Sequence, residues 1–279
     1  MRNTLFTAAI AALLLTGCSS GAPASSQAPA SSEPESNVLR VGMECNYAPF
    51  NWTTTSANEF TRPITSVDYA DGYDVVIATR IAEELGREVQ IVKTDWDNLI
   101  PALQHGTLDL VIAGMTDTPD RRESVDFTDP YYSSEEVIIV RKDSELVNIT
   151  DIQDLGGYAV RGQMNTIYDE IIDQINGVVH AEPKEDYPSM VFSLQQGEVD
   201  AITAELPVAI GVVNANSDLT YVTFADGHGF DADTTVSVAL AKGNEDLITE
   251  INAILAGISY DERQSIMGAA VDRQPSSEE

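Results

Sequence analysis

The chain has 279 residues, of which 45 are acidic and 15 basic, so its formal net charge is −30. It carries no basic stripe that could neutralise phosphates, which argues against nucleic-acid binding. An anionic bilayer should also repel the folded part of so acidic a chain.

The N-terminus has the pattern of an export signal. Arg2 precedes an apolar run, Leu5–Leu15, that is too short to span a bilayer. The following Leu-Thr-Gly-Cys resembles the lipobox of bacterial lipoproteins, which implies removal of residues 1–17 and lipidation of Cys18. A plain secretory signal with a chance cysteine is the alternative. Cys45 is the other cysteine, so lipidation of Cys18 would leave no intramolecular disulfide.

Residues 18–37 follow as a segment rich in Ser, Ala and Pro, with no apolar face. Such a sequence cannot bury enough surface to fold and predicts a flexible tether. We therefore expect a domain that is anchored by lipid on the extracytoplasmic side of a cell membrane.

Beyond the tether, period-two apolar strands alternate with helix-like stretches, which predicts an α/β fold. The expected strands are Leu39–Met43, Val89–Lys93, Asp109–Ala113, Glu136–Arg141, Tyr158–Gly162, Asp200–Thr203, Tyr221–Phe224 and Val236–Leu240. The expected helices are Tyr73–Leu85, Asp97–His105, Thr166–Ile175, Ser189–Gln196, Pro207–Asn214, Glu245–Ala256 and Asp261–Ala270.

Two segments share the same order of residues. LIPALQHGTLDLVIAG at 99–114 and VFSLQQGEVDAITAE at 191–205 both read helix, Leu, Gln, Gly, Asp, strand. This echo predicts two similar α/β lobes whose strand ends open onto one crevice.

The most informative stretch is 109–132, in which an apolar strand ends at Gly114 and leads to Arg121. Thr116 and Thr118 offer hydroxyls just past the strand, where open α/β sheets bind ligands. Free N–H groups and a guanidinium suit a small carboxylate. An ordinary connection with a surface arginine is the alternative.

Catalytic patterns are mostly absent: the chain has no GxSxG, HExxH, P-loop or CxxC motif. Its histidines, His105, His180 and His228, lack the spacing of metal ligands. Asp226, Asp231 and Asp233 could cradle calcium, but their order does not match an EF-hand, and a solvated acidic turn is favoured. We expect no metal and no cofactor.

The remaining polar residues suit a zwitterion. Arg121 and Thr116 could bind a carboxylate, and Glu205, at the end of its strand, could bind an ammonium group. Glu44 and Tyr47, after the first strand, should lie near the same crevice. Each acidic residue read by itself could equally be a solvated surface group.

The chain resembles the substrate-binding lipoproteins of polar amino acid ABC transporters, the bacterial extracellular solute-binding proteins of family 3. The resemblance runs from Leu39 to about Ala270. Four motifs in order carry it: LRVGMECNYAPFNW at 39–52, GYDVVIATRIAEELG at 72–86, WDNLIPALQHGTLDLVIAGMTDTPDRRESVDFTDPYY at 96–132 and AKGNEDLITEINAIL at 241–255.

This resemblance implies a two-lobed fold of the type II periplasmic-binding-protein kind. Lobe 1 would comprise residues 38–132 and 237–279, and lobe 2 residues 137–229. The segments 133–136 and 230–236 would form the hinge.

Site residues follow from the same resemblance. In lobe 1, Arg121 matches the clamp for the α-carboxylate, Thr116 its hydroxyl partner, and Gly114 a carbonyl that accepts from the ammonium. Tyr73 and Tyr47 match aromatic walls for the ligand side chain. Glu44 takes the acidic position that reads a cationic or amide group.

In lobe 2, AVRGQMNT at 159–166 matches a turn that usually reads Gln-x-Gly-Thr. Thr166 would donate to the carboxylate and Gln163 would face the pocket. Asn165 replaces the usual glycine, and asparagine tolerates a left-handed backbone. Glu205 stands where many relatives carry an aspartate against the ammonium.

The resemblance therefore implies a monomeric binding protein that captures a polar or cationic amino acid by hinge closure and delivers it to an ABC permease. No enzymatic activity is expected. An exported lyase of the cyclohexadienyl dehydratase kind, a ligand-sensing lipoprotein and a structural adhesin are the alternatives.

Overall fold

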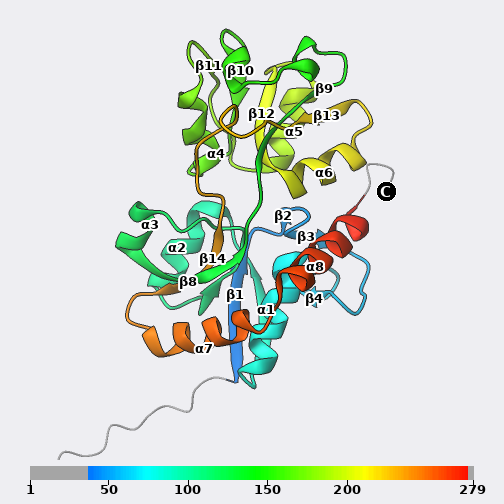
Figure 1. The fold of residues 1–279 in the computed structure, drawn as a ribbon. Coiled ribbons are helices and arrows are strands. Elements are labelled where there is room, and N and C mark those ends of the chain that lie inside the picture. The colour runs from blue at the N-terminus through cyan, green and yellow to red at the C-terminus, as the bar shows by residue number, and fades with distance from the viewer. Residues whose placement is uncertain (1–36, 276–279) are drawn as a thin grey trace, which may run out of the picture. The chain divides into compact units, whose positions relative to one another are not determined.

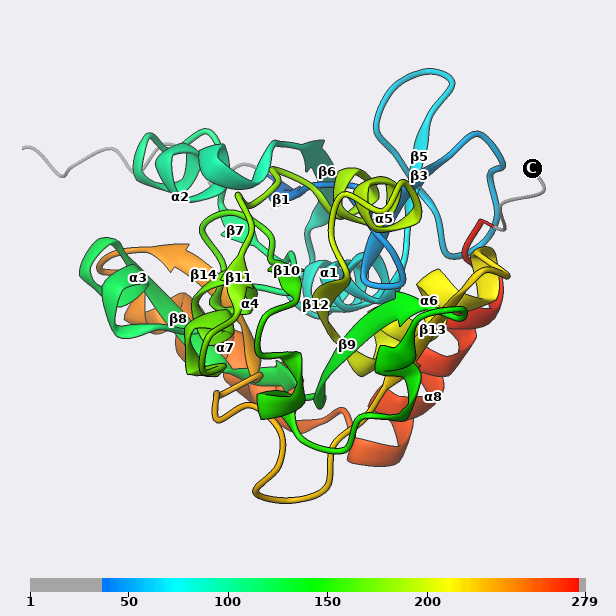
Figure 2. The same cartoon turned by 90° about the horizontal axis from the view of Figure 1, so that it is seen from above.

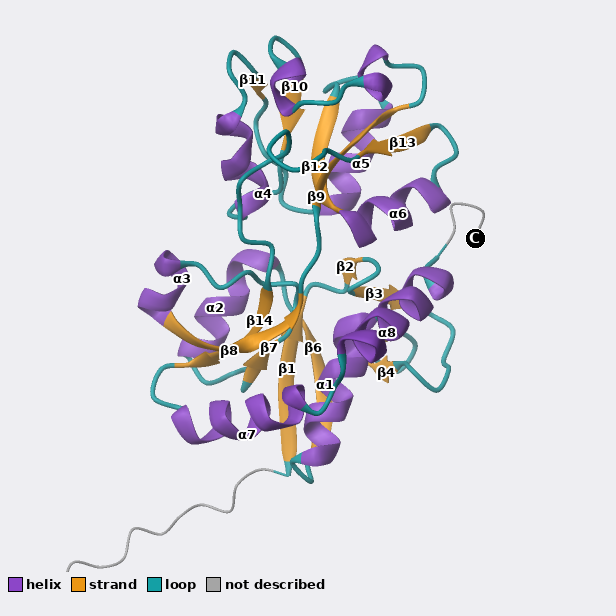
Figure 3. Ribbon diagram, in the orientation of Figure 1, coloured by secondary structure: helices purple, strands orange, loops and turns teal. Residues whose placement is uncertain are grey.

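The computed structural model describes residues 37–275. These residues form two five-stranded sheets and a smaller four-stranded sheet, with helices packed on them (Figure 1). Strands and helices alternate along most of the chain (Figure 3), so the α/β prediction is confirmed.

The first five-stranded sheet has the order β6-β1-β7-β14-β8. Strands β1, β6 and β7 run parallel, whereas β14 is antiparallel to both β7 and β8. The bounds are β1 Val38–Met43, β6 Glu88–Lys93, β7 Leu110–Val111, β8 Val125–Tyr132 and β14 Val236–Ala241. The helices around it are α1 Tyr73–Glu84, α2 Trp96–Gln104, α3 Pro119–Ser124, α7 Glu245–Ala256 and α8 Tyr260–Arg273. We call this part lobe 1.

The second sheet has the order β11-β10-β12-β9-β13 and defines lobe 2. Its strands are β9 Glu136–Arg141, β10 Ala159–Arg161, β11 Val179–His180, β12 Ala201–Glu205 and β13 Leu219–Val222. Its helices are α4 Ile167–Glu170, α5 Tyr187–Gln195 and α6 Leu206–Ala215, with short 3-10 helices η1 Glu145–Asn148, η2 Ile152–Leu155 and η3 Ile171–Gln174.

The chain passes between the lobes twice, at 133–135 and at 223–235 (Figure 1). The longer passage has no helix or strand, and its Phe224 and Phe230 pack against the core of lobe 2. Strand β1 points its carboxyl end toward lobe 2 in Figure 1, so residues that follow it reach the region between the lobes.

Most predicted elements lie close to their expected bounds, and two, Glu136–Arg141 and Glu245–Ala256, match them. The strand expected at 109–113 is shorter, because only Leu110 and Val111 pair with β1. The helix expected at 166–175 is divided into α4 and η3. The strand expected at 221–224 lies two residues earlier, as β13.

Strand β11, the 3-10 helices η1 and η2 and two further features were not predicted. One is the small sheet β2-β3-β5-β4, formed by Asn46–Tyr47, Asn51–Thr54, Arg62–Pro63 and Tyr69–Asp71. These strands are too short and polar to show a period of two. The other is β8, whose sequence VDFTDPYY contains a proline and whose register with β14 shifts near Ser237.

Gly72 makes the sharp turn from β5 into α1. Its φ is +133°, and a Cβ there would lie 2.2 Å from the carbonyl oxygen of Phe50. Only glycine fits both constraints. The start of α1 is thereby fixed against β3, behind the carboxyl end of β1.

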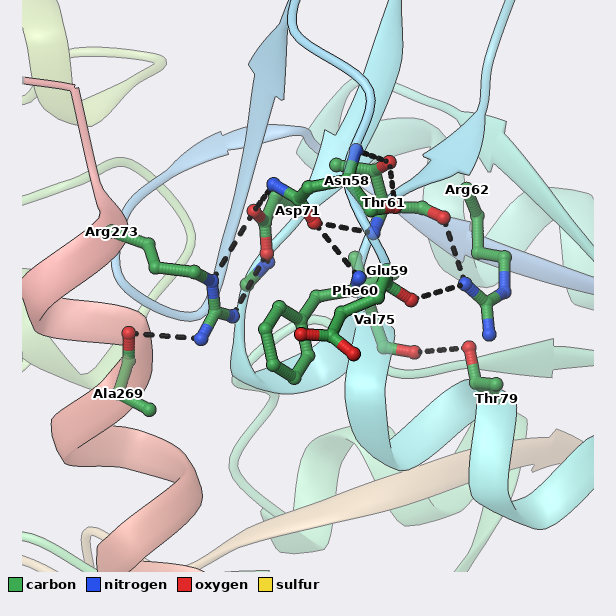
Figure 4. A network of polar contacts seen from close by, with 11 residues as sticks. Asn58, Glu59, Phe60, Thr61, Arg62, Asp71, Val75, Thr79, Ala269 and Arg273 are labelled. Carbon is green, nitrogen blue, oxygen red and sulfur yellow. Dashed lines mark hydrogen bonds and ion pairs between the residues drawn. The ribbon is translucent and has the colours of Figure 1, made fainter.

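The C-terminal end of α8 is tied to the small sheet through Asp71, which is only 2% exposed (Figure 4). Arg273 donates from Nη2 to Oδ1 of Asp71 at 2.9 Å and from Nε to Oδ2 at 3.4 Å. Asn58 Nδ2 donates to the same carboxylate at 3.1 Å, and the guanidinium lies 4.0 Å above the ring of Phe60. This network joins the last helix to the first third of the chain.

We expect Arg273→Ala to lower the free energy of unfolding by about 3 kcal/mol, because it leaves the buried Asp71 carboxylate without its cation. Urea denaturation measures this loss. Arg80→Ala is the matched control, since Arg80 pairs with Glu262 at the surface and should cost less than about 1 kcal/mol. Equal losses in the two variants would refute the role of the Arg273–Asp71 pair.

Candidate functional site

A narrow cavity lies between the two lobes. Lobe 1 contributes Glu44, Tyr47, Trp96, Ala113, Gly114, Thr116 and Arg121, and lobe 2 contributes Gln163, Thr166, Ile167 and Tyr168.

The lobe 1 wall is built at the carboxyl ends of β1 and β7. Glu44 directly follows β1, and Gly114 and Thr116 follow β7. Gly114 has φ +60°, and its N–H donates to the hydroxyl of Tyr131 at 2.9 Å. Parallel strand ends thus bring these residues to one edge of the sheet, as open α/β folds do at their ligand sites.

Arg121 provides the positive charge of the cavity. It lies in the first turn of α3, where its N–H donates to the N-cap hydroxyl of Thr118. The guanidinium donates from Nη1 to the Thr116 carbonyl at 2.7 Å and lies 5.1 Å from the ring centre of Trp96. Burial lowers the pKa of Arg121 to about 10, so it is still a cation at neutral pH.

Glu44 places a buried carboxylate in the same cavity. It is 5% exposed, and Gln163 Nε2 donates to its two oxygens at the long distances of 3.3 and 3.4 Å. Burial raises the pKa of Glu44 to about 7, and the nearby carboxylates of Asp186, Asp95 and Asp97 add to this shift. Among the described residues that line the cavity, Arg121 is the only cationic side chain.

Tyr47 stacks on Phe50, with ring centres 5.5 Å apart and planes 9° from parallel. Its hydroxyl donates to Oε1 of Glu205, and Ser134 donates to Oε2 of the same carboxylate at 2.6 Å. Glu205 is fully buried, and burial raises its pKa to about 7. Each of its two oxygens therefore accepts from one hydroxyl group.

The lobe 2 wall follows β10. Asn165 has φ +59°, which confirms the expectation that it adopts the left-handed backbone usual for glycine. Thr166 is buried and donates its hydroxyl to the Gln163 carbonyl at 2.8 Å. Gln163 also donates to the carbonyl of Glu185 at 3.1 Å, which fixes its amide against the cavity.

Direct hydrogen bonds across the cavity hold the lobes together. The Asn165 carbonyl accepts from Trp96 Nε1 at 3.2 Å and from Arg121 Nη2 at 3.0 Å. The Asn165 amide donates to Asp97 at 2.7 Å. With the Gln163–Glu44 and Tyr47–Glu205 bonds, these contacts define a closed arrangement of the two lobes.

Asp74 supports both parts of the lobe 1 wall from behind. Its carboxylate is fully buried and accepts from Tyr131 Oη and from Asn51 Nδ2, each at 2.8 Å. Tyr131 accepts from the Gly114 N–H, and Asn51 accepts from the Cys45 N–H at 2.7 Å. Asp74 was not predicted as a site residue, because a buried acid in a helix cannot be distinguished from a surface one by spacing.

The structure brings most of the expected residues together at the cavity, but not all of them. It lines the cavity with Glu44, Tyr47, Gly114, Thr116, Arg121, Gln163 and Thr166. It does not place Tyr73 there: the ring is fully buried between Phe50, Tyr131 and Tyr132, and its hydroxyl donates to the Tyr131 carbonyl. Glu205 lies behind Tyr47 rather than at the wall.

Trp96, Ile167 and Tyr168 line the cavity and were not predicted as site residues. Trp96 begins α2 soon after β6, so its place near a strand end was a usable signal. Ile167 and Tyr168 lie in the short α4, and nothing in their spacing distinguishes them from ordinary apolar helix residues.

Cys18 and the export signal lie outside the described residues. Within 37–275, no helix is long and apolar enough to cross a membrane. In the same range, no group of three or more His, Cys, Asp or Glu side chains is arranged to hold a metal ion.

The family model for bacterial extracellular solute-binding proteins, family 3, matches residues 39–267, and the chain belongs to this family. A probable histidine-binding protein of Campylobacter jejuni is 30% identical, over 89% of this chain and 89% of the relative. The L-cystine-binding protein TcyJ of Escherichia coli is also 30% identical, over 81% of this chain and 79% of its own length. The family expected from the sequence motifs is thus confirmed.

A solved structure supports the same fold. An amino acid ABC transporter substrate-binding protein, AbpA from Streptococcus pneumoniae, bound to L-arginine, superposes with a TM-score of 0.72 at 25% identity. The superposition covers 85% of this chain and 95% of that chain. These proteins are binding proteins and not enzymes, which agrees with the expectation of a non-enzymatic role.

We expect the Glu205 carboxyl to make the ligand-free protein less stable as the pH rises. Its pKa is about 7 in the folded state against 4.5 in the reference state, so the folded chain binds the proton more tightly. The stabilisation is complete below the unfolded pKa and is lost as the pH rises through the folded pKa. Between pH 4.5 and 7, the free energy of unfolding should therefore fall less steeply with rising pH in Glu205→Gln than in wild type.

Urea denaturation at several pH values in this range measures the slope. Glu83→Gln, which removes an exposed carboxylate from α1, controls for the loss of one negative charge. If wild type and Glu205→Gln have the same slope, the buried carboxyl does not titrate in this range.

Proposed function

We propose that this chain is the extracytoplasmic binding component of an amino acid ABC importer and that it captures a polar or, preferentially, cationic L-amino acid between its lobes. The observation that carries this proposal is the cavity itself, in which the Arg121 guanidinium and the buried Glu44 carboxylate line one closed space. The named ligands of the relatives, histidine, L-cystine and L-arginine, support an amino acid as the ligand.

The ligand's α-carboxylate binds at Arg121 in this proposal. A guanidinium has several N–H donors in one plane, so its bonds to the Thr116 and Asn165 carbonyls leave donors for a carboxylate. The Thr116 hydroxyl completes the carboxylate site from lobe 1. Thr166 adds its hydroxyl from lobe 2 when it exchanges the Gln163 carbonyl for the ligand carboxylate. Tyr47 and Trp96 form apolar walls for the ligand's carbon chain.

Selectivity comes from Glu44. A carboxylate that is desolvated and weakly hydrogen-bonded gains much from a cation or an amide donor. The carboxylates of Asp95, Asp97 and Asp186 strengthen the negative field around it. An acidic ligand side chain would be repelled at this end of the cavity, so aspartate and glutamate are disfavoured.

Capture proceeds by closure of lobe 2 over a ligand that first binds to lobe 1. The segments 133–136 and 230–236 serve as hinges between lobe 1 (38–132 and 237–279) and lobe 2 (137–229). The direct cross-lobe bonds of Asn165, Gln163 and Glu205 support this proposal, because they form only when the lobes meet. A ligand that contacts both walls favours the closed state through its additional bonds there.

The bound amino acid is delivered to the permease of the importer. The permease recognises the closed form of the binding protein, which is a monomer. In this proposal residues 1–17 are a signal peptide that is removed, and lipid on Cys18 holds the domain at the membrane. Residues 18–37 then act as the tether. The lipobox-like sequence and the extracellular family support this location.

We expect Arg121→Ala to weaken amino acid binding at least about 100-fold, because it removes a charge-assisted clamp worth about 3 kcal/mol or more. Titration calorimetry of wild type against a set of common L-amino acids first identifies the tightest ligand. The variant is then titrated with that ligand. A cooperative urea denaturation curve should show that the variant is folded.

The neighbouring Arg122→Ala is the matched control, because Arg122 is exposed and pairs with Asp117 instead of lining the cavity. It should bind within about twofold of wild type. Wild-type affinity in Arg121→Ala would contradict the assignment of the clamp, and a wild type that binds no amino acid would contradict the proposed function.

Glu44→Gln is expected to weaken a cationic ligand much more than a neutral one, since it removes the charge and keeps the shape. The loss for L-arginine should be about tenfold or more, and the loss for L-glutamine should be about threefold or less. Calorimetric titration with both ligands measures the difference. Equal shifts for the two ligands would show that Glu44 does not read charge.

A further inference from the structure

Tyr168 carries an unpaired polar group at the cavity. The residue lines the cavity from α4, is 6% exposed, and its hydroxyl oxygen is buried. Among the residues that the structure describes, this hydroxyl has no hydrogen-bonding partner. A buried hydroxyl without a partner costs free energy, so native proteins rarely retain one without a reason.

The side chain is not free to find a partner elsewhere. The backbone carbonyl of Tyr168 accepts from the Thr203 hydroxyl at 2.7 Å, which fixes α4 on β12. The ring belongs to a small apolar cluster with Ile167 and Ile171, against which Phe230 packs. The hydroxyl is therefore held in place by its surroundings.

Three other buried hydroxyls near the cavity are paired. Tyr47 donates to Glu205, Thr166 donates to the Gln163 carbonyl at 2.8 Å, and Tyr187 donates to the Thr203 carbonyl at 2.9 Å. Tyr168 is unlike them. An orphaned hydroxyl at a ligand cavity is the pattern expected of a group whose partner is the ligand.

The charges around Tyr168 indicate which part of the ligand it meets. Burial raises the pKa of the Tyr168 hydroxyl well above its ordinary value, and the carboxylates of Glu205 and Glu136 add to this shift. The group is thus a neutral phenol in a negative field, which favours a cationic donor as its partner. Glu205 is not among the residues that line the cavity and lies behind Tyr47, so it acts on the ligand from behind the wall.

We propose that the Tyr168 hydroxyl oxygen is the lobe 2 acceptor for the α-ammonium group of the bound amino acid, with the Glu205 carboxylate behind it as the buried counter-charge. This inference rests on the proposed function and deepens it by assigning the ammonium subsite. It also gives Glu205 a role that agrees with its position behind the cavity wall.

The test combines Tyr168→Phe with ligands that lack the ammonium group. Wild type and variant are titrated with L-arginine, L-lysine and L-glutamine and, by displacement, with the desamino analogue of each. For each amino acid that binds, the variant should lose about tenfold in affinity, as expected for one hydrogen bond to a charged group. For the analogues the two proteins should agree within about twofold.

Stability of the free protein provides a second readout. Because Tyr168→Phe removes an unpaired hydroxyl, the ligand-free variant should be at least as stable to urea as wild type. Tyr187→Phe is the matched control: it removes a paired hydroxyl, so it should lower stability and leave the preference for an ammonium group unchanged.

The outcomes separate this inference from the proposed function. Equal losses of affinity for amino acids and analogues would overturn the role of Tyr168, and so would no loss for any amino acid. In both cases, binding of an amino acid by wild type would still uphold the proposed function. A wild type that binds none of the amino acids would overturn both.

Discussion

The carboxylate of Asp74 is the interaction on which the geometry of the site depends. It is fully buried at the start of α1 and bonds through Tyr131 to Gly114 and through Asn51 to Cys45. These two backbone positions adjoin Thr116 and Glu44, which are the two chemical ends of the cavity wall. One carboxylate thus sets the separation between Thr116 and Glu44, the proposed sites for the ligand backbone and for its side chain. The fixed turn at Gly72 places Asp74 where it can do so.

In the proposed function, the distribution of charge around the cavity explains how a very acidic protein prefers one class of ligand. Surface carboxylates are solvated, so their charges are largely screened. Glu44 and Glu205 are buried, and burial raises the pKa of each to about 7. A cationic ligand replaces some of the solvation that these groups lost on folding. The proposed selectivity for charge is in this way coupled to the burial that accompanies the proposed closure.

Strand ends made the lobe 1 wall predictable. Glu44, Gly114 and Thr116 all follow apolar strands, and Arg121 follows in the next turn, so sequence order alone brought them near one another. The lobe 2 turn at Asn165 was predictable because asparagine accepts the left-handed backbone that the turn needs. The family motifs then assigned these residues their expected roles.

Other features depended on packing that no local pattern encodes. Tyr73 and Tyr47 are both tyrosines near turns, but only the three-dimensional arrangement puts Tyr73 in an aromatic cluster and Tyr47 at the cavity. Tyr168 and Asp74 gain their roles from what surrounds them after folding. The short strands β2 to β5 have too few residues to show a period, and β8 is interrupted by a proline.

The position of β14 has a consequence for how the chain folds. This strand lies between β7 and β8 in the sheet of lobe 1, yet all of lobe 2 precedes it in the sequence. Figure 2 shows the same interleaving from above, with α8, the last helix, beside α6 of lobe 2. During synthesis from the N-terminus, the chain can therefore complete the sheet of lobe 2 before that of lobe 1. The sheet of lobe 1 is complete only with β14, which begins more than 100 residues after the end of β8. Such high contact order slows folding, and until β14 arrives β7 and β8 present open edges to the solvent.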